Sequence, residues 1–344
     1  MISVPNGTGD IPCGYDICFA DDIRFAYEGT DIISCLRSKY IMRLWPYIIS
    51  HSDISFHIAP PPLLCYNTLK GGDDMFGAIY GDIMGSYYET HCTKDYDFEF
   101  QKDSTFTDDT VLTVAVCKTI LNNPDTITRW NLRKRGMEYA GQFRQYYSYY
   151  PHAGFGNMFS EWARSDTYKI NRSYANGAAM RVVPIGYAYD TIDQVLLQAK
   201  ANCFFTHKNS EAIKASQAVA TAVFLARNGE SKDKIRSFLE NKFHYNLSKN
   251  LDEIRKNYVF DSRASYSVPP AIIAFLESSD YESSIRNAIS LGGDADTEAC
   301  IAGGIAEAFY KEIPKHISDF CDRKIDYSLK KVVFEFKDTF CKLG

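Results

Sequence analysis

The chain has 344 residues, of which 45% are hydrophobic, so it can bury one large core or two of ordinary size. Its formal net charge of −5 argues against the broad basic surface with which a general nucleic-acid binder displaces counterions from phosphates. It has no stretch of ~20 apolar residues, no signal-peptide pattern at its start and no Cys-x-x-Cys pair, so we expect a soluble cytoplasmic protein with no nucleic-acid or membrane partner.

The first 70 residues differ from the rest of the chain. They mix Gly, Pro and aromatic residues without a sustained period and end near Pro60-Pro61-Pro62, which cannot continue a helix. Residues 1–34 hold six acidic side chains against the single basic Arg24, so this arm carries a net charge of −5 and the remainder sums to about zero. We therefore predict an acidic N-terminal extension at 1–70, a boundary near Leu69 to Gly72, and a body at 71–344.

From Gly72 onward, apolar residues recur at helical spacing with recognisable helix ends. Val111 to Leu121 follows Thr and Asp residues that can cap a first turn, and Asn209 to Ala226 is closed by Asn228-Gly229, a suitable left-handed terminus. Further predicted helices are Ile192 to Cys203, Ser231 to Phe243, Leu247 to Asn257, Ala271 to Ser278, Tyr281 to Leu291 and Glu298 to Tyr310. Strand-like alternation is scarce, so the body is predicted to be all-α, with amphipathic segments from Lys315 to Gly344 covering it.

Two apolar segments contain repeated glycines. One holds Gly72, Gly77, Gly81 and Gly85, and the other is interrupted by Gly303-Gly304. Each glycine costs a helix up to ~1 kcal/mol relative to Ala, so we expect these glycines to permit close backbone packing. The two helices are therefore predicted to lie at the centre of the body.

Adjacent carboxylates precede one of the predicted helices, in Phe106-Thr107-Asp108-Asp109-Thr110. Such neighbours repel each other unless a cation or several donors lies between them, which indicates a metal site. The alternative is simple N-capping, because Thr and Asp are favoured at helix starts and acidic groups suit the positive end of the helix dipole.

A second cluster, Gly292-Gly293-Asp294-Ala295-Asp296-Thr297, has the same layout before another apolar helix. Together the two starts supply four carboxylates and two hydroxyls, the all-oxygen set that suits Mg²⁺, Mn²⁺ or Ca²⁺. A third element, from Gly81 to Glu89, ends a glycine-rich helix in a polar tip. Glu89 is a candidate catalytic carboxylate there, although alone it would more often be a surface acid.

Five motifs in order resemble the ADP-ribosylglycohydrolases. They are Gly-Asp-x-x-Gly-x-x-x-Glu at 81–89, Phe-Thr-Asp-Asp-Thr at 106–110, Asn-Gly-Ala-Ala-Met-Arg at 176–181, Thr-His at 206–207 and Gly-Gly-Asp-Ala-Asp-Thr at 292–297. The resemblance runs from about Gly72 to Pro314, roughly 70% of the chain, and does not cover the N-terminal arm.

The resemblance implies an orthogonal bundle of α-helices with two Mg²⁺ ions, or Mn²⁺ in their place, at the base of a cleft. By motif match the metal ligands are Thr107, Asp108, Asp109, Asp294, Asp296 and Thr297. Glu89 matches the glutamate that lies over the ribose near the scissile bond, and either Asp109 or Asp296 is expected to position the attacking water.

Three further segments are expected to bind the substrate. The resemblance implies that Gly154, Phe155 and Gly156 shape the ADP-ribose pocket, and that Asn176, Gly177 and Ala178 contact the diphosphate and distal ribose. Met180 and Arg181 are expected to be framework residues. Spacing alone favours His207 as a helix cap, whereas the resemblance favours a contact with the phosphates.

The expected reaction is hydrolysis of the N-glycosidic bond between ADP-ribose and a protein side chain, with arginine as the default linkage. One alternative is an enzyme of the same family that acts on a small ADP-ribosyl metabolite without a protein partner. Another is a non-catalytic binding protein on the same fold, although the intact motif aspartates count against that.

The acidic arm suggests a second function. A hydrolase body after about 70 residues of extension resembles bacterial immunity proteins, in which the arm plugs the NAD pocket of a secreted ADP-ribosyltransferase toxin. The interface residues would be Tyr15, Asp16, Phe19, Asp21, Asp22, Phe25, Tyr27 and Glu28. The alternative is an ordinary helical extension packed on the body.

Overall fold

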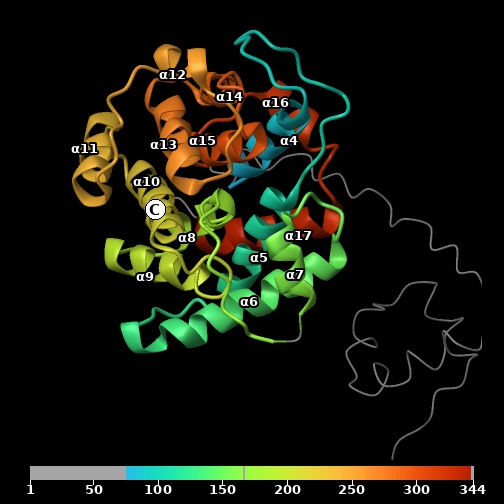
Figure 1. Ribbon diagram of the computed structural model, residues 1–344, viewed down its shortest axis with the longest axis vertical. Helices are drawn as coiled ribbons and strands as arrows, with labels where there is room; N and C mark the ends of the chain where they lie inside the picture. Colours follow the sequence, from blue (N-terminus) through green and yellow to red (C-terminus); the bar gives the residue numbers. More distant parts are fainter. Residues whose placement is uncertain (1–74, 166, 342–344) are drawn as a thin grey trace, which may run out of the picture. The chain divides into compact units, whose positions relative to one another are not determined.

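The chain divides into a unit of residues 1–69 and a unit of residues 70–344. A computed structural model describes residues 75–165 and 167–341, all of which belong to the second unit. This part is built from α-helices, and its described residues form only isolated β-bridges (Figure 1). The predicted all-α fold is therefore confirmed. No helix within the described residues is both long and apolar enough to cross a membrane.

Two glycine-rich helices form the centre of the unit: α4 (Gly77–Thr90) and α15 (Ala295–Tyr310), which lie side by side (Figure 1). A Cβ atom on Gly81 would stand 2.1 Å from the carbonyl oxygen of Ala299, and one on Gly85 would stand 2.4 Å from that of Ala295. Since no methyl group fits at these distances, the two backbones touch directly. The close packing that the glycine pattern predicted is confirmed.

The remaining helices surround this pair in two groups. Those that contact α4 or α15 are α5 (Asp108–Asn122), α8 (Val183–Ala188), α10 (Ser210–Arg227), α13 (Ala264–Leu276), α14 (Tyr281–Ile289) and α16 (Lys315–Cys321). The outer group is α6 (Leu132–Tyr149), α7 (Asn157–Arg164), α9 (Ile192–Asn202), α11 (Lys232–Phe243), α12 (Leu251–Asn257) and α17 (Tyr327–Phe340). Two short 3-10 turns complete the unit, η2 (Arg129–Asn131) and η3 (Asn176–Ala178).

Several helix ends follow the signals in the sequence. The Asn209 side chain accepts the N–H of Glu211 at the start of α10, and Ser231 accepts that of Lys234 at the start of α11. Gly229 closes α10 with a φ of 79°, the left-handed conformation that a glycine terminus supplies. Capping chemistry is local, which is why these ends can be read from the sequence.

Other boundaries differ from the prediction. Helix α13 begins at Ala264 rather than Ala271, because Pro269 and Pro270 lie inside it instead of preceding it. Pro270 has no N–H, so the carbonyl oxygen of Tyr266 lacks its usual helical hydrogen bond. The hydroxyl of Tyr258 lies 3.4 Å from that oxygen. Similarly, α12 begins at Leu251 and α15 at Ala295, a few residues away from the expected starts.

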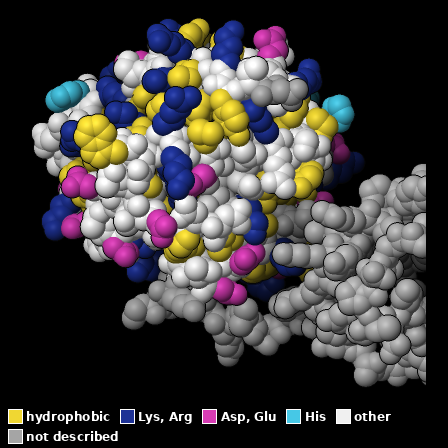
Figure 2. Space-filling model, turned by 90° about the horizontal axis from the view of Figure 1, so that it is seen from below, with side chains coloured by type: hydrophobic (Ala, Val, Ile, Leu, Met, Phe, Trp, Pro, Cys, Tyr) yellow, Lys and Arg dark blue, Asp and Glu magenta, His cyan; other side chains and the backbone are white. Residues whose placement is uncertain are grey.

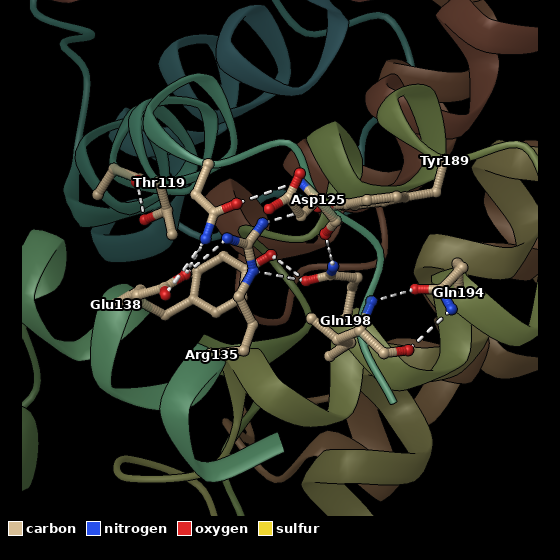
Figure 3. A network of polar contacts seen from close by, with 11 residues as sticks. Thr119, Asp125, Arg135, Glu138, Tyr189, Gln194 and Gln198 are labelled. Atoms are coloured by element: carbon tan, nitrogen blue, oxygen red, sulfur yellow. Dashed lines mark hydrogen bonds and ion pairs between the residues drawn. The ribbon is translucent and has the colours of Figure 1, made fainter. Parts of the chain in front are cut away.

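A buried polar network joins α6 to α9 and to the segment after α8 (Figure 3). The Arg135 guanidinium donates to Gln198 Oε1 at 2.8 Å, to Glu138 Oε2 at 2.8 Å and to the Tyr189 hydroxyl at 2.7 Å. Its charge is balanced by Glu138 on the same helix. The network therefore satisfies a buried cation from within the protein.

The surface of the unit carries both signs of charge. On the face seen from below, Lys and Arg side chains are spread among acidic and hydrophobic ones (Figure 2). Among the described residues, several surface charges form pairs four residues apart, such as Lys234 with Glu230 and Lys315 with Asp319. Exposed pairs of this kind contribute little to stability, so the fold depends on its core rather than on its surface charges.

Candidate metal centre and active site

The first acidic cluster forms the start of α5. Thr107 is the N-cap, and its hydroxyl accepts the N–H of Asp109 at 3.3 Å. Asp108 and Asp109 occupy the first turn, and Asp109 is buried. The Thr107 hydroxyl caps the helix, whereas the Asp108 and Asp109 carboxylates are not used for capping. N-capping and a pair of free carboxylates, which the sequence left as alternatives, therefore occur together in this segment.

The second cluster forms the start of α15. Asp294 stands at the N-cap position, but its side chain makes no capping bond; its Oδ2 accepts from Asn176 Nδ2 at 2.8 Å. Asp296 Oδ1 accepts the N–H of Thr297 at 2.8 Å, and the Thr297 hydroxyl donates to Asp109 Oδ2 at 3.3 Å. The starts of α5 and α15 therefore meet, as the duplicated pattern predicted.

A further carboxylate, Asp82, lies on the central helix α4 and contacts the start of α5. It accepts the N–H of Thr107 at 2.9 Å, the Thr107 hydroxyl at 2.7 Å, the N–H of Thr110 at 3.1 Å and the Thr110 hydroxyl. Asp82 is fully buried on α4. It was quoted in a motif but given no role, since a single acid inside an apolar helix does not reveal that the start of another helix will fold onto it.

The carboxylates crowd together closely enough to hold cations. One oxygen from each of Asp82, Asp109 and Asp296 lies within 4.8 Å of the other two, and the same is true of Glu89, Asp294 and Asp296. The buried Oδ1 of Asp109 has no hydrogen-bond partner among the described residues. These ligand atoms are all oxygens, which hard divalent cations prefer. The residues therefore fit a divalent metal.

The electrostatics of the cluster agree with this. Burial, followed by the nearby Asp82 and Asp294, raises the pKa of Asp108 to about 8, and burial raises the pKa of Asp82 to about 6. Burial and neighbouring carboxylates also raise the pKa values of Asp109 and Asp296 well above the ordinary range. Without a cation, these groups cannot all be charged together at neutral pH.

A cavity of about 400 Å³ lies against the cluster. Its wall contains Glu89, Asp108, Asp109, Asp294, Asp296 and Thr297 from the acidic motifs, together with Gly154, Gly156, Asn176, Gly177 and His207 from the loops expected to bind substrate. Elements far apart in sequence thus converge on one space large enough for a small ligand.

Three predicted residues do not line this cavity. Thr107 stands behind the cluster and bonds Asp82. The Phe155 ring stacks on Phe159 with 5.2 Å between centroids, and Ala178 is buried with its carbonyl accepting from Asn202. A loop motif indicates which segment approaches a ligand, but not which of its side chains turn toward the packed interior.

Glu89 is exposed and lies near the end of α4, at the edge of the cluster. Burial of the carboxyl group, then the negative charges of Asp294 and Asp82, raise its pKa. Within the described residues, Glu89 is the one motif acid of the cavity wall that is exposed, although its carboxyl group is partly enclosed. Its position suits contact with a bound substrate at the mouth of the metal site.

Some cavity residues were not predicted to be there. Arg181 and Thr206 lie in its wall, as do Met158, Tyr174 and Phe260, which are at least half exposed. Arg181 belongs to a quoted motif but was expected to be only a framework residue. Phe260 precedes α13 in a segment without a distinctive pattern, so no sequence signal marks it. The eight arm residues predicted to bind a partner, from Tyr15 to Glu28, lie outside the described residues.

Comparisons with known proteins agree with the geometry. A family model described as ADP-ribosylglycohydrolase matches residues 73–336. ADP-ribosylhydrolase ARH3 of Homo sapiens is 26% identical over 326 residues, which cover 72% of this chain and 87% of the relative. The ARH3 of Xenopus tropicalis is 26% identical over 311 residues, covering 69% and 86%.

The fold is also shared with a solved structure described as an ADP-ribosylglycohydrolase-related protein complex. It is 20% identical, gives a TM-score of 0.57, and the match covers 77% of this chain and 97% of the other. The family model spans well over half of the sequence, including all the acidic motifs at the meeting helix starts. The chain therefore belongs to the ADP-ribosylglycohydrolase family.

Proposed function

We propose that this chain hydrolyses the glycosidic bond that joins the anomeric carbon of ADP-ribose to an acceptor side chain. The observation that carries the proposal is the meeting of two acidic helix starts in the wall of one cavity. A cavity with crowded carboxylates at one side and glycine loops at another suits a ligand that has sugar hydroxyls at one end and phosphates further along.

The residues divide the work by position. Asp108, Asp109, Asp294 and Asp296 with Thr297 would hold two divalent ions, Mg²⁺ or Mn²⁺, with Thr107 behind them. When bound, such ions orient sugar hydroxyls and a water and stabilise negative charge. Asp109 or Asp296 would accept the proton of the attacking water, and Glu89 would contact the ribose at the exposed edge. The transition state would resemble an oxocarbenium ion, as in other glycosidases.

The linkage determines which modified side chain the enzyme would act on. Arginine remains our default acceptor, but the curated relatives carry the wider name ADP-ribosylhydrolase, which gives arginine no particular support. Hydrolysis of an N-glycosidic and of an O-glycosidic linkage can be compared directly with two matched peptides. One carries ADP-ribose on arginine through nitrogen, and the other carries it on serine through oxygen. Faster release of ADP-ribose from the serine peptide would overturn the arginine assignment and leave the hydrolase assignment intact.

The hydrolase assignment is tested on the metal cluster. Asp108→Asn and Asp296→Asn should each abolish release of free ADP-ribose, and EDTA should do the same to the unaltered protein until Mg²⁺ is restored. Asp319→Asn is the matched control, because Asp319 is an exposed aspartate on α16 whose only ion-pair partner among the described residues is Lys315. Undiminished hydrolysis by the two cluster variants would show that the cluster is not the active site.

We also propose that the acidic arm binds and occludes a cognate ADP-ribosyltransferase toxin, because a hydrolase body after such an extension resembles bacterial immunity proteins. Its acidic groups and aromatic rings would supply the charge and the apolar contacts of such an interface. Deletion of residues 1–34 should abolish stoichiometric inhibition of the transferase and spare hydrolysis. If hydrolysis is lost as well, the arm is a structural extension and the immunity role has no basis.

A further inference from the structure

Arg181 is a fully buried cation in the cavity wall that has no ion-pair partner among the described residues. Its Nε donates to Asn202 Oδ1 at 3.0 Å, and its Nη2 donates to the Asn202 carbonyl at 3.2 Å and to the Thr206 hydroxyl at 2.8 Å. Its Nη1 has no partner among the described residues. A buried charge left in this way favours an anion nearby.

The bond from Arg181 uses one of the two lone pairs of the Thr206 oxygen. A guanidinium can only donate, so the Thr206 oxygen accepts, and its own hydrogen is free to be donated elsewhere. The neighbouring acceptor is Nδ1 of His207, which lies 2.9 Å from the Thr206 oxygen. That hydrogen has no other acceptor among the described residues, so the arrangement that satisfies it leaves the lone pair on Nδ1 of His207 and the ring hydrogen on Nε2.

The other ring nitrogen of His207 lies beside Gly177 in the wall of the cavity. Nε2 of His207 lies 3.4 Å from the position that a Cβ atom on Gly177 would occupy, and both residues line the cavity. Burial and the charge of Arg181 lower the pKa of His207 well below its ordinary value, so the ring is neutral at physiological pH. The group presented to the ligand is thus an N–H donor.

We propose that Arg181, acting through the Thr206 hydroxyl, is the positioning residue that holds His207 in its Nε2–H tautomer and makes this wall a hydrogen-bond donor for a phosphate oxygen. Diphosphate oxygens accept hydrogen bonds and carry negative charge, so they match the imidazole N–H and the positive charge of the buried guanidinium. The identity of the ligand rests on the proposed function, whereas the tautomer does not.

The tautomer can be read without any ligand. In long-range ¹H–¹⁵N NMR spectra of histidine-labelled protein, with the His207 signals assigned through His207→Gln, Nε2 should appear protonated and Nδ1 unprotonated. Thr206→Val keeps the shape of the side chain but removes the hydroxyl, so it should shift His207 toward a mixture of tautomers. Thr206→Ser should restore the original pattern. An Nδ1–H ring in the unaltered protein would overturn the proposal.

Binding supplies the second readout. In calorimetry with ADP-ribose and Mg²⁺, Thr206→Val should weaken affinity by roughly tenfold, the typical loss for one hydrogen bond to a charged acceptor, and Thr206→Ser should recover most of it. Thr221→Val is the control, because Thr221 is a buried threonine of α10 whose hydroxyl has no partner among the described residues. Unchanged affinity in Thr206→Val, or equal losses in the Val and Ser variants, would overturn the positioning role.

The two hypotheses fail separately. If the Nε2–H tautomer and its dependence on Thr206 are observed but the unaltered protein does not bind ADP-ribose, the positioning role is supported and the proposed ligand is wrong.

Discussion

Two buried polar regions of this protein differ in how their charges are satisfied. Around Arg135, one cation meets Glu138, Gln198 and Tyr189, and its three nitrogens each donate to a nearby acceptor (Figure 3). At the starts of α5 and α15, carboxylates face one another, and the buried Oδ1 of Asp109 has no partner among the described residues. The first region is complete without a ligand, whereas the second needs a cation.

This difference separates a structural network from a site. Burying polar groups is tolerated when donors and acceptors are matched, and it becomes costly when like charges are enclosed together. A protein keeps the costly arrangement only where binding offsets it, so unmatched buried charge marks function more reliably than burial or hydrogen bonding alone. Substitutions in the acidic cluster and in the Arg135 network should therefore have different effects on activity and on stability.

The largest effect is expected at the unmatched oxygen. Asp109→Asn should reduce hydrolysis by more than ~1000-fold, because a metal ligand and a candidate proton acceptor are lost together. In EDTA the same variant should be more stable than the unaltered protein, by about 1–3 kcal/mol, since one crowded charge is gone. Activity assays and urea unfolding in EDTA measure the two effects. Loss of both activity and stability would mean that Asp109 is a structural residue.

Arg135→Met should produce the opposite pattern. Removal of the guanidinium leaves the Gln198 and Tyr189 groups short of a donor, so the free energy of unfolding should fall by about 2–3 kcal/mol. Hydrolysis per folded molecule should not change, because no residue of this network lines the cavity. A drop in kcat at a temperature where the variant is fully folded would show that the two regions are coupled.

The acidic region should also respond to pH. In the metal-free protein the pKa of Asp82 is about 6 and that of Asp108 about 8, both raised by burial from an ordinary value of 3.8. Between about pH 4 and pH 8 the folded state therefore holds more protons than the unfolded chain, so its stability falls as pH rises.

Metal ligands must be deprotonated, so Mg²⁺ should offset this loss, and the gain in Tm on adding Mg²⁺ should grow from about pH 5 to about pH 8. Thermal melts at several pH values, with Mg²⁺ or with EDTA, measure the gain. Arg135→Met should keep the same trend at a lower Tm. A gain that does not vary with pH would contradict the assignment of Asp108 as a metal ligand.

The smallest effect is expected from a single hydroxyl of the matched network. Tyr189→Phe removes one acceptor of Arg135 and should cost about 1 kcal/mol of unfolding free energy. Tyr245→Phe is the control, because the buried hydroxyl of Tyr245 has no hydrogen-bond partner among the described residues. Denaturant unfolding compares the two. Equal stabilities would show that the bond from Arg135 to Tyr189 contributes nothing measurable.

Much of the fold could be predicted because its signals are local. The caps at Asn209 and Ser231 and the terminus at Gly229 act within one turn of their own helix. The start of α13 could not be predicted in the same way, because the tolerance of Pro269 and Pro270 inside a helix depends on its surroundings. Helix α6 was missed for a related reason: its 18 residues have polar and aromatic faces whose partners, such as Gln198, come from distant segments.

The site residues also divide into those with a local sequence signal and those whose contacts come from distant segments. Duplicated acidic helix starts predicted that Asp109 and Asp296 would act together, and the two residues do lie in one cluster. Asp82 was given no role and Arg181 only a framework role, because their contacts with Thr107 and Thr206 are tertiary and leave no local signal. Phe155 illustrates the converse, since a correctly chosen loop does not determine the direction of each side chain.

The contact between α4 and α15 has a consequence for how this protein can change over time. Because Gly81 and Gly85 place the two main chains against each other, the spacing between Asp82 on α4 and Asp296 on α15 is set by the backbone rather than by exchangeable side chains. Substitutions of apolar side chains elsewhere in the core should therefore leave the geometry of the acidic cluster unchanged. The loops of the cavity wall have no such constraint, so new substrate preferences can arise there while the cation site keeps its geometry.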